Sequence, residues 1–419
     1  MSLEKLGQNA KTAARRLARV PAEKKNAALS RLADRLWAER AAILDGNHQD
    51  VDAGQAAGLT PALLDRLTLN EARLTGVIND LRGVIELPDP VGERFDESTL
   101  PNGLKLRKQR VPLGVLGVIY ESRPNVTVDV AGLALKSGNS VVLRGGKETM
   151  ASNRALVAVI RQALSDSELP VDAVQFIDDP ARERVAEMLR LHDYIDMIIP
   201  RGSAALHQYC RENSLIPVIT GGIGICHLFV DNTADLKASI AVIRNAKIQR
   251  PSVCNALDTA LVHRDIAGQF IPELVDTLAK DGVTFRADPE SLAILGRRPA
   301  SLVLPAGPQD FDTEWLALIL GIKVVAGIDE AIEHISEHST AHSDGILTAS
   351  PENAERFITR VDSAAVYVNA STRFTDGAQL GLGAEVAVST QRLHARGPMG
   401  LRELTTYKWV IQGDYHIRP

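Results

Sequence analysis

The chain has 419 residues, of which 45% are hydrophobic and 24% are charged, a composition typical of soluble globular proteins and unlike that of disordered chains. Its 47 basic and 52 acidic residues form no long run of one sign, and only 4% of the residues are aromatic. These numbers exclude the basic, aromatic-rich surface that nucleic-acid binding requires, and they favour a small-molecule ligand.

The chain length and the cysteine content indicate the number of domains and the kinds of site to expect. A chain this long exceeds one ordinary core, so we expect at least two domains. The three cysteines, Cys210, Cys226 and Cys254, are odd in number and form no CxxC pair, which argues against a disulfide framework and a zinc site. We therefore expect a reducing, cytoplasmic location. No segment reaches the roughly 18 uncharged apolar residues of a membrane span.

The first quarter of the chain is helical in pattern. Within residues 1–95, Leu29, Leu32, Leu36 and Ile43 recur at near-helical spacing. The Ala- and Arg-rich start carries acidic residues and continues this amphipathic pattern, so we interpret it as structure rather than as a transit peptide.

After residue 103 the period changes. Alternating Leu104 and Leu106 predict a hairpin arm, and the apolar run through Val115 to Tyr120 predicts a buried parallel strand. Strand and helix patterns then alternate, which predicts βαβ units and a parallel sheet with ligand loops after the strands. A second α/β series follows at about residues 240–360, and the end, "LTTYKWVIQGDY", is β-like and suited to adding a strand to a neighbouring subunit.

Cys254 stands in "IQRPSVCNALDTALVH", where Pro251 excludes a helix interior and a turn leads into a strand. A nucleophilic cysteine needs access and nearby positive charge, and Lys247 and Arg250 are close in sequence. A buried structural cysteine is the more common alternative, because free cysteine is among the most buried residue types. Cys210 and Cys226 have no such setting and are interpreted as structural.

Two further loops follow predicted strands. "IYESRPNVT" contains Asn125, which could donate its amide to an oxyanion or could be a turn asparagine. "VVLRGGKE" combines glycines with Arg144 and Lys147 and suits a phosphate, although a solvated turn is the equal alternative. The chain lacks both the Walker pattern and the GxGxxG fingerprint.

Two weaker signals lie elsewhere. Gly202 and Ser203 in "IIPRGSAAL" open a helix whose amides could face a pyrophosphate. His334, His338 and His342 recur every four residues, but Ser339 and Thr340 predict that the helix ends before His342, so we expect no metal site.

Six stretches, in this order, resemble the gamma-glutamyl phosphate reductase family of the aldehyde dehydrogenase superfamily: "GVIYESRPNVT", "VVLRGGKE", "IQRPSVCNA", "VNASTRFTDG", "GLGAEVAVSTQRLHARGPMGL" and "ELTTYKW". The resemblance covers nearly the whole chain. It implies an aldehyde dehydrogenase-like α/β fold with a Rossmann-type cofactor domain, an α/β catalytic domain and a β-rich oligomerisation arm. The implied boundaries are residues 1–97 and 113–240 for the cofactor domain, with a return segment at about 355–380, residues 241–354 for the catalytic domain, and residues 98–112 and 381–419 for the arm and tail.

The resemblance also implies roles for single residues. Cys254 matches the family's nucleophile, which reverses the preference drawn from spacing, and Asn125 matches its oxyanion donor. The loop that meets the adenosine ribose and 2′-phosphate matches Arg144, Gly145, Gly146 and Lys147, which implies NADPH as the cofactor. Gly202 and Ser203 match the pyrophosphate turn, and Glu314 the glutamate that binds the nicotinamide ribose. The substrate-binding candidates, unranked, are Arg123, Ser371, Thr372 and Arg373. Arg396 is either a phosphate contact or a structural arginine.

The implied reaction is the NADPH-dependent reduction of L-glutamyl 5-phosphate to L-glutamate 5-semialdehyde through a cysteine thioester, the second step of proline biosynthesis from glutamate. Ile219 stands where hydrolytic aldehyde dehydrogenases carry a general-base glutamate, so the thioester should resist water. The implied partners are a homo-oligomer and a glutamate 5-kinase that supplies the acyl phosphate. The alternatives are a hydrolytic semialdehyde dehydrogenase and a non-catalytic scaffold.

Overall fold

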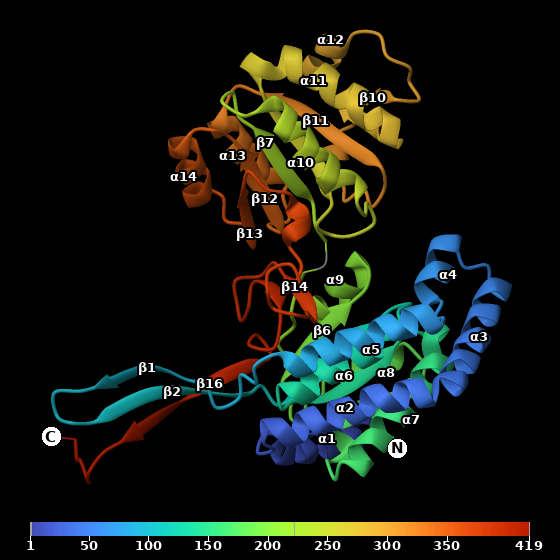
Figure 1. Cartoon of the computed structure of the whole chain (residues 1–419), viewed down its shortest axis with the longest axis vertical. Coiled ribbons are helices and arrows are strands. Elements are labelled where there is room, and N and C mark those ends of the chain that lie inside the picture. Colours follow the sequence, from blue (N-terminus) through green and yellow to red (C-terminus); the bar gives the residue numbers. More distant parts are fainter. Residues whose placement is uncertain (1, 222, 419) are drawn as a thin grey trace. The chain divides into compact units, whose positions relative to one another are not determined.

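The computed structural model describes residues 2–221 and 223–418, apart from the side chain of Ala62, and divides into two compact units. The first unit comprises residues 1–220, 381–387 and 399–419, and the second comprises residues 221–380 and 388–398. Figure 1 labels the elements of both units. No helix in the described part of the chain is long and apolar enough to cross a membrane.

The first unit is built on a four-stranded parallel sheet in the order β5-β4-β3-β6. Its strands are β3 (Val115–Tyr120), β4 (Ser140–Gly145), β5 (Val174–Phe176) and β6 (Met197–Arg201). Strands β3 and β4 are buried over their whole length, and for β3 the continuous apolar run predicts this burial. The helices are α1 (Leu3–Leu17), α2 (Ala22–Ala38), α3 (Arg40–Ala56), α4 (Pro61–Leu67), α5 (Glu71–Glu86), α6 (Asn125–Lys136), α7 (Met150–Asp166), α8 (Glu183–Met188) and α9 (Ala204–Asn213), with 3₁₀ helices η1 (Lys147–Thr149) and η2 (Val171–Ala173).

One face of this sheet shares an apolar core with α1, α8 and α9. Helices α6 and α7 cover strands of the sheet, and α2, α3 and α5 form a further layer against them. Helix α6 ends at Lys136, and Gly138, which follows the C-cap Ser137 with a φ of 77°, supplies the left-handed residue past the helix end.

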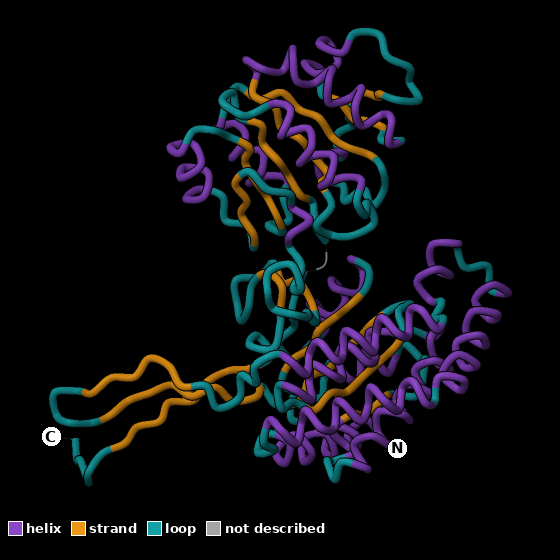
Figure 2. The backbone as a smooth tube through the Cα atoms, viewed as in Figure 1, coloured by secondary structure: helices purple, strands orange, loops and turns teal. Residues whose placement is uncertain are grey.

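A three-stranded antiparallel sheet projects from the body of the first unit (Figure 2). Strands β1 (Arg94–Thr99) and β2 (Lys105–Pro112) form the predicted hairpin, and β16 (Thr405–Gln412) pairs with β2 over its whole length. The C-terminal tail therefore adds its strand to the hairpin of its own chain, and one edge of β16 stays open.

The second unit holds a seven-stranded parallel sheet in the order β10-β9-β11-β8-β7-β12-β13. The strands are β7 (Cys226–Val230), β8 (Leu257–His263), β9 (Thr284–Ala287), β10 (Val303–Pro305), β11 (Ile319–Val325), β12 (Ser343–Leu347) and β13 (Ala365–Val368). The helices are α10 (Leu236–Ile248), α11 (Arg264–Leu278), α12 (Pro289–Leu295), α13 (Ile328–His338) and α14 (Pro351–Arg360), with η3 (Ala279–Asp281), η4 (Asp310–Asp312) and η5 (Thr372–Phe374).

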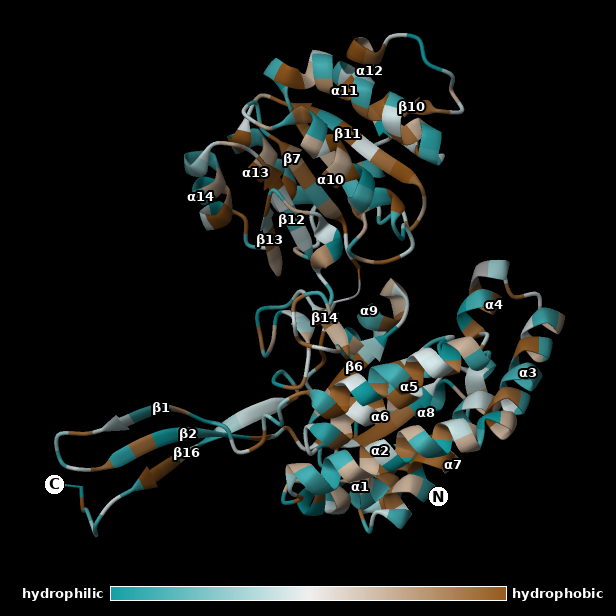
Figure 3. Cartoon of the chain, viewed as in Figure 1, coloured by the Kyte–Doolittle hydropathy of each residue, from teal (hydrophilic) through white to brown (hydrophobic). Residues whose placement is uncertain are grey.

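This unit has two hydrophobic cores, one on each face of the sheet, because side chains alternate between the two faces along a strand. Leu228 and Val230 pack with α10 and α11, whereas Phe229, between them, packs with α13 and α14. Figure 3 shows the apolar central strands between these more polar helices. Short strands β14 (Ala387–Ser389) and β15 (Gly397–Met399) pair where the chain passes between the units.

The observed units and arm differ from the expected domains at three places. The first long segment ends at residue 220 rather than 240, because β7 and α10 belong to the second sheet. Residues 355–380 do not return to the first unit, because β13 adds in parallel to β12. The arm also begins earlier than expected, at Arg94.

Candidate active site

Three of the predicted loops meet at one edge of the first unit's sheet. They follow β4, β3 and β6, which are neighbours in the sheet, and so they lie at the carboxyl ends of adjacent parallel strands. The loops carry the sequence candidates Arg123 and Asn125, Arg144 to Lys147, and Gly202 with Ser203. The structure therefore brings these candidates together, as the βαβ pattern predicts.

Two carboxylates fasten these loops to one another. Glu148 accepts hydrogen bonds from the backbone N–H and the hydroxyl of Ser122, both at 2.7 Å. Glu121 accepts one from the backbone N–H of Ser203 at 2.8 Å. Sequence reasoning missed Glu148, because no pattern around it signals that it reaches a loop 26 residues earlier.

The turn at Gly202 and Ser203 holds a carboxylate of the chain itself. A Cβ at Gly202 would lie 2.4 Å from a carboxylate oxygen of Glu121, so this close approach of Glu121 requires glycine. Ser203 is the N-cap of α9, whose N-terminal amides carry the positive end of the helix dipole. In this structure the Glu121 carboxylate occupies the Ser203 amide.

The loop after β4 contains one buried and one exposed cation. The Arg144 guanidinium donates to the carbonyls of Gly145 and Pro180 at 3.1 and 2.8 Å, so it shapes the loop from within. Burial lowers its pKa, and Glu148 opposes that shift. Lys147 is exposed at the start of η1. Of the two, Lys147 is the one free to meet a phosphate.

Asn125 is the first residue of α6 and is half-buried. Its Nδ2 donates to Oδ2 of Asp129, one helical turn further on, at 2.9 Å. Burial raises the pKa of Asp129 to about 7, and the hydrogen bond from Asn125 opposes the shift. Asp129, which the sequence did not single out, thus fixes the orientation of the Asn125 amide.

Cys254 lies in the second unit, in the turn between α10 and β8. It is partly exposed, whereas Cys210 and Cys226 are buried. Burial raises the pKa of the Cys210 thiol to about 11 and that of Cys226 well above its usual range. The two other thiols are therefore held in the unreactive form, in agreement with their interpretation as structural cysteines.

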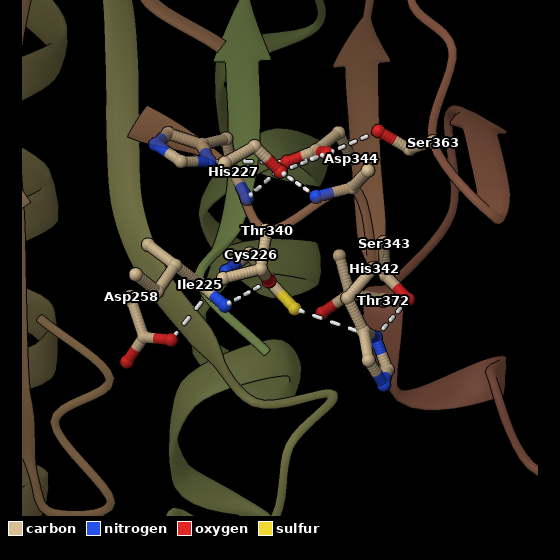
Figure 4. A network of polar contacts seen from close by, with 12 residues as sticks. Ile225, Cys226, His227, Asp258, Thr340, His342, Ser343, Asp344, Ser363 and Thr372 are labelled. Atoms are coloured by element: carbon tan, nitrogen blue, oxygen red, sulfur yellow. Dashed lines mark hydrogen bonds and ion pairs between the residues drawn. The ribbon is translucent and has the colours of Figure 1, made fainter. Parts of the chain in front are cut away.

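The Cys254 turn is packed against the start of β7. A Cβ at Gly224 would lie 1.6 Å from the carbonyl oxygen of Cys254, so the turn requires glycine there. The Cys226 thiol donates to the same carbonyl at 3.2 Å and points toward His342 (Figure 4). The Cys226 N–H donates to Asp258. The structural thiol thus supports the backbone of the exposed one.

A buried polar network continues beside Cys226 (Figure 4). Asp344 accepts from the backbone N–H of His227 at 2.9 Å, from the hydroxyl of Ser363, and from Ser339 at 2.6 Å. His227 Nδ1 lies 3.0 Å from the same carboxylate. This network ties β7 to β12 below the Cys254 turn.

The loop with the substrate-binding candidates is fastened to the residue after Cys254. Asn255 donates its amide to the carbonyl of Thr375 at 2.9 Å, and Thr372 donates its hydroxyl to the carbonyl of Asn255 at 2.7 Å. The Ser371 hydroxyl caps η5 by accepting from the N–H of Arg373. Ser371 and Thr372 are buried and serve the loop itself, which leaves Arg373 as the candidate able to reach a ligand.

Glu314 lies close to the same turn. Its carboxylate accepts from the backbone N–H of Gly224 at 2.9 Å. Burial raises its pKa to about 7, the hydrogen bond from Gly224 opposes the shift, and Asp258 adds to it. The structure thus supplies an ionisable carboxyl beside the segment that supports Cys254.

The remaining candidates have structural surroundings. Lys247 is buried, donates to the carbonyl of Leu257 at 2.8 Å and lies 3.6 Å from Asp258, so its charge is compensated away from the turn surface. Arg396 pairs with Asp362, which favours the structural alternative. Helix α13 ends at His338, so His342 is not on it, as predicted. Ile219 is buried.

Comparisons with known proteins agree with the resemblance. The model of the aldehyde dehydrogenase family matches residues 2–291. A gamma-glutamyl phosphate reductase of Aeromonas salmonicida is 59% identical over 417 residues, which span all of both chains. The crystal structure of a gamma-glutamyl phosphate reductase of Thermotoga maritima superposes with a TM-score of 0.96 at 48% identity, over 99% of each chain. An engineered glycolyl-CoA reductase solved with NADP+ shares the fold at 18% identity, with a TM-score of 0.70 over 98% of this chain and 96% of its own.

Proposed function

Because the chain belongs to the gamma-glutamyl phosphate reductases of the aldehyde dehydrogenase family, we propose that it reduces L-glutamyl 5-phosphate to L-glutamate 5-semialdehyde and inorganic phosphate in proline biosynthesis. The observation that carries the proposal is the partly exposed Cys254, whose turn packs against Gly224 and is held by hydrogen bonds from Cys226 and to the loop of Thr375. The full-length identity to proteins of that name supplies the substrate.

In the proposed reaction the Cys254 thiolate attacks the γ-acyl carbon of the substrate. The bond between sulfur and carbon forms first and gives a tetrahedral oxyanion. When this oxyanion collapses, the carbon–oxygen bond to the phosphate breaks and phosphate leaves with the electron pair. Asn125 donates its amide to the oxyanion of the tetrahedral intermediate, with Asp129 holding that amide in position. Because Ile219 offers no base to activate water, the resulting thioester persists.

The enzymes of this family use nicotinamide cofactors, and we propose NADPH for this chain. When bound, NADPH supplies the hydride that converts the thioester to the thiohemiacetal, from which the semialdehyde leaves and the Cys254 thiolate returns. In the proposal, the backbone of Gly145, Gly146, Gly202 and Ser203 binds the dinucleotide, and the Glu314 carboxylate accepts from the hydroxyls of the nicotinamide ribose. Lys147 supplies the exposed charge for a 2′-phosphate, with Arg144 shaping its loop.

Three further parts of the proposal concern the surroundings of the enzyme. A cytoplasmic location suits the free thiols. A homo-oligomer would cover the open edge of the arm, and a glutamate 5-kinase would supply the labile acyl phosphate. The substrate is held in part by Arg373, and Arg123 is a further candidate.

The test is the reverse reaction, in which NADP+ reduction is followed with glutamate 5-semialdehyde in the presence and absence of inorganic phosphate. We expect a rate that requires phosphate, because only phosphate resolves the thioester. An equal rate without phosphate would establish the hydrolytic alternative. Cys254→Ala should abolish turnover while leaving NADPH binding intact, and Cys210→Ala is the matched control because that thiol is buried in the other unit. A chain inactive in both directions with NADPH bound would be the non-catalytic scaffold.

A further inference from the structure

Two arginines lie beside Cys254 without a carboxylate partner. Arg250 is exposed in the turn that precedes Cys254, and Arg373 is half-buried in the loop after β13. Nε of Arg373 donates to the neutral side chain of Gln249 at 3.0 Å. Among the described residues, neither guanidinium forms an ion pair, although most arginines of this unit do.

The chain segments that carry the two arginines are joined to the segment of the nucleophile by hydrogen bonds. Asn255, the residue after Cys254, donates its amide to the carbonyl of Thr375 at 2.9 Å and contacts the carbonyl of Arg373 at 3.4 Å. The hydrogen bond from Arg373 to Gln249 joins the same loop to the residue before Arg250. The loop of Arg373 and the turn of Cys254 therefore form one interlocked piece of backbone.

The positive charges of Arg250 and Arg373 repel each other. Burial lowers the pKa of Arg373, and the positive charge of Arg250 lowers it further. Asp376 and the Cys254 thiol oppose the shift, but the Asp376 carboxylate is already engaged by the N–H groups of Ala378 and Gln379. Two neighbouring cations cost stability unless an anion joins them. The arrangement is that of a receptor for an anion with more than one charge.

We propose that Arg250 and Arg373 bind the phosphoryl group of the acyl phosphate during attack by Cys254, and inorganic phosphate in the reverse reaction. This assignment rests on the proposed function and adds to it the residues that hold the leaving group. By binding the phosphate oxygens the two guanidiniums stabilise the charge that grows as the carbon–oxygen bond breaks. They also stabilise the Cys254 thiolate before substrate binds.

The geometry favours the phosphoryl group over the substrate's α-carboxylate. One oxygen atom joins the phosphorus to the acyl carbon that Cys254 attacks, whereas three carbon atoms separate that carbon from the α-carboxylate. A phosphate dianion also matches two planar guanidiniums in charge and in paired hydrogen bonds better than a single carboxylate does. Arginines on the turn of Cys254 and on the loop joined to it are therefore assigned to the phosphoryl group.

The first test separates the two anions kinetically in the reverse reaction. For Arg250→Ala and Arg373→Ala we expect the KM for inorganic phosphate to rise about tenfold or more, as loss of a charge-assisted hydrogen bond predicts, with little change in the KM for semialdehyde. Arg297→Ala, an exposed arginine of the same unit outside the site, should leave both constants unchanged. If the KM for semialdehyde rises instead, the arginines bind the carboxylate and the proposal is overturned.

The second test needs no turnover. Inorganic phosphate should bind the free wild-type enzyme in calorimetric titration and slow alkylation of Cys254 by iodoacetamide, and both effects should be lost in the alanine variants. Arg250→Lys and Arg373→Lys keep the charge without the paired donors and should be intermediate, which provides folded variants if an alanine variant does not fold. Wild-type phosphate affinity in all four variants would refute the receptor. A phosphate-independent reaction of the wild type would refute the proposed function instead, so the two failures are distinguishable.

Discussion

At the scale of single residues, Glu314 is a candidate cofactor ligand whose ionisation should be visible near neutral pH. Its pKa is raised from 4.5 to about 7 by burial, so the folded protein holds its proton over a range in which the unfolded chain has lost it. A raised carboxyl pKa means that stability falls as pH rises from about 4.5 to about 7. The ionised carboxylate, in contrast, is the better acceptor for ribose hydroxyls.

We therefore predict opposite effects of pH on cofactor binding and on stability. In the wild type the Kd for NADPH, measured by fluorescence, should decrease as pH rises through about 7, the value to which the pKa of Glu314 is raised. Glu314→Gln keeps an acceptor for the Gly224 N–H but cannot ionise, so its Kd should be independent of pH in this range. Its free energy of unfolding relative to wild type should improve as pH rises from 5 to 8. Parallel pH profiles of the two proteins would contradict the assignment.

At the scale of elements, the loop after β4 separates two roles that the sequence could not. Arg144 and Lys147 are both basic and three residues apart, but the carbonyls of Gly145 and Pro180 engage the first while the second is exposed. Lys147 should therefore carry the preference for the 2′-phosphate.

We predict that Lys147→Ala raises the Kd for NADPH about fivefold, since an exposed charge pair contributes up to about 1 kcal/mol, and leaves the Kd for NADH nearly unchanged. The ratio of the two constants, measured by fluorescence titration, is the readout. Lys237→Ala, an exposed lysine on α10 outside the site, is the control. Equal weakening of both cofactors would place Lys147 elsewhere than at the 2′-phosphate.

The strands and loops also show which features could be predicted from the sequence. The continuous apolar run from Val115 to Tyr120 identified β3, because a strand that is buried on both faces is apolar along its length. Strand β7 was missed, since its five residues include His227, whose burial is satisfied by Asp344, 117 residues away. Cys254 could be singled out from its motif. The hydrogen bond from Asn255 to Thr375 could not be predicted, because the two residues are 120 positions apart in sequence.

At the scale of the whole molecule, the chain's ends and its domains are set by strand pairing over long distances. The tail was expected to add a strand to a neighbouring subunit, and that pairing stays a prediction; within its own chain β16 pairs with β2 from Thr405 to Gln412. Likewise, β13 joins β12 rather than returning to the first unit. Periodicity gives the type of an element but not its partner, so these placements required the structure.

The three-stranded arm leads to the last prediction, which concerns assembly. Tyr407, Trp409 and Ile411 alternate along β16, so they share one face of the strand, and 46%, 54% and 63% of their surfaces are exposed. Lys108 lies over the rings of Tyr407 and Trp409. An open strand edge beside exposed apolar side chains is a liability unless another chain covers it.

We therefore expect the arm to be buried in a homo-oligomer. The double variant Trp409→Lys, Ile411→Lys places like charges on this face and should convert the oligomer to monomers in sedimentation velocity, with each unit still folded, because the changed side chains are outside both cores. Leu215→Lys is the matched control, since Leu215 is 60% exposed in the same unit away from the arm, and it should leave the assembly intact. A double variant that sediments like wild type would show that β16 is not the contact, and the open edge would then need another partner.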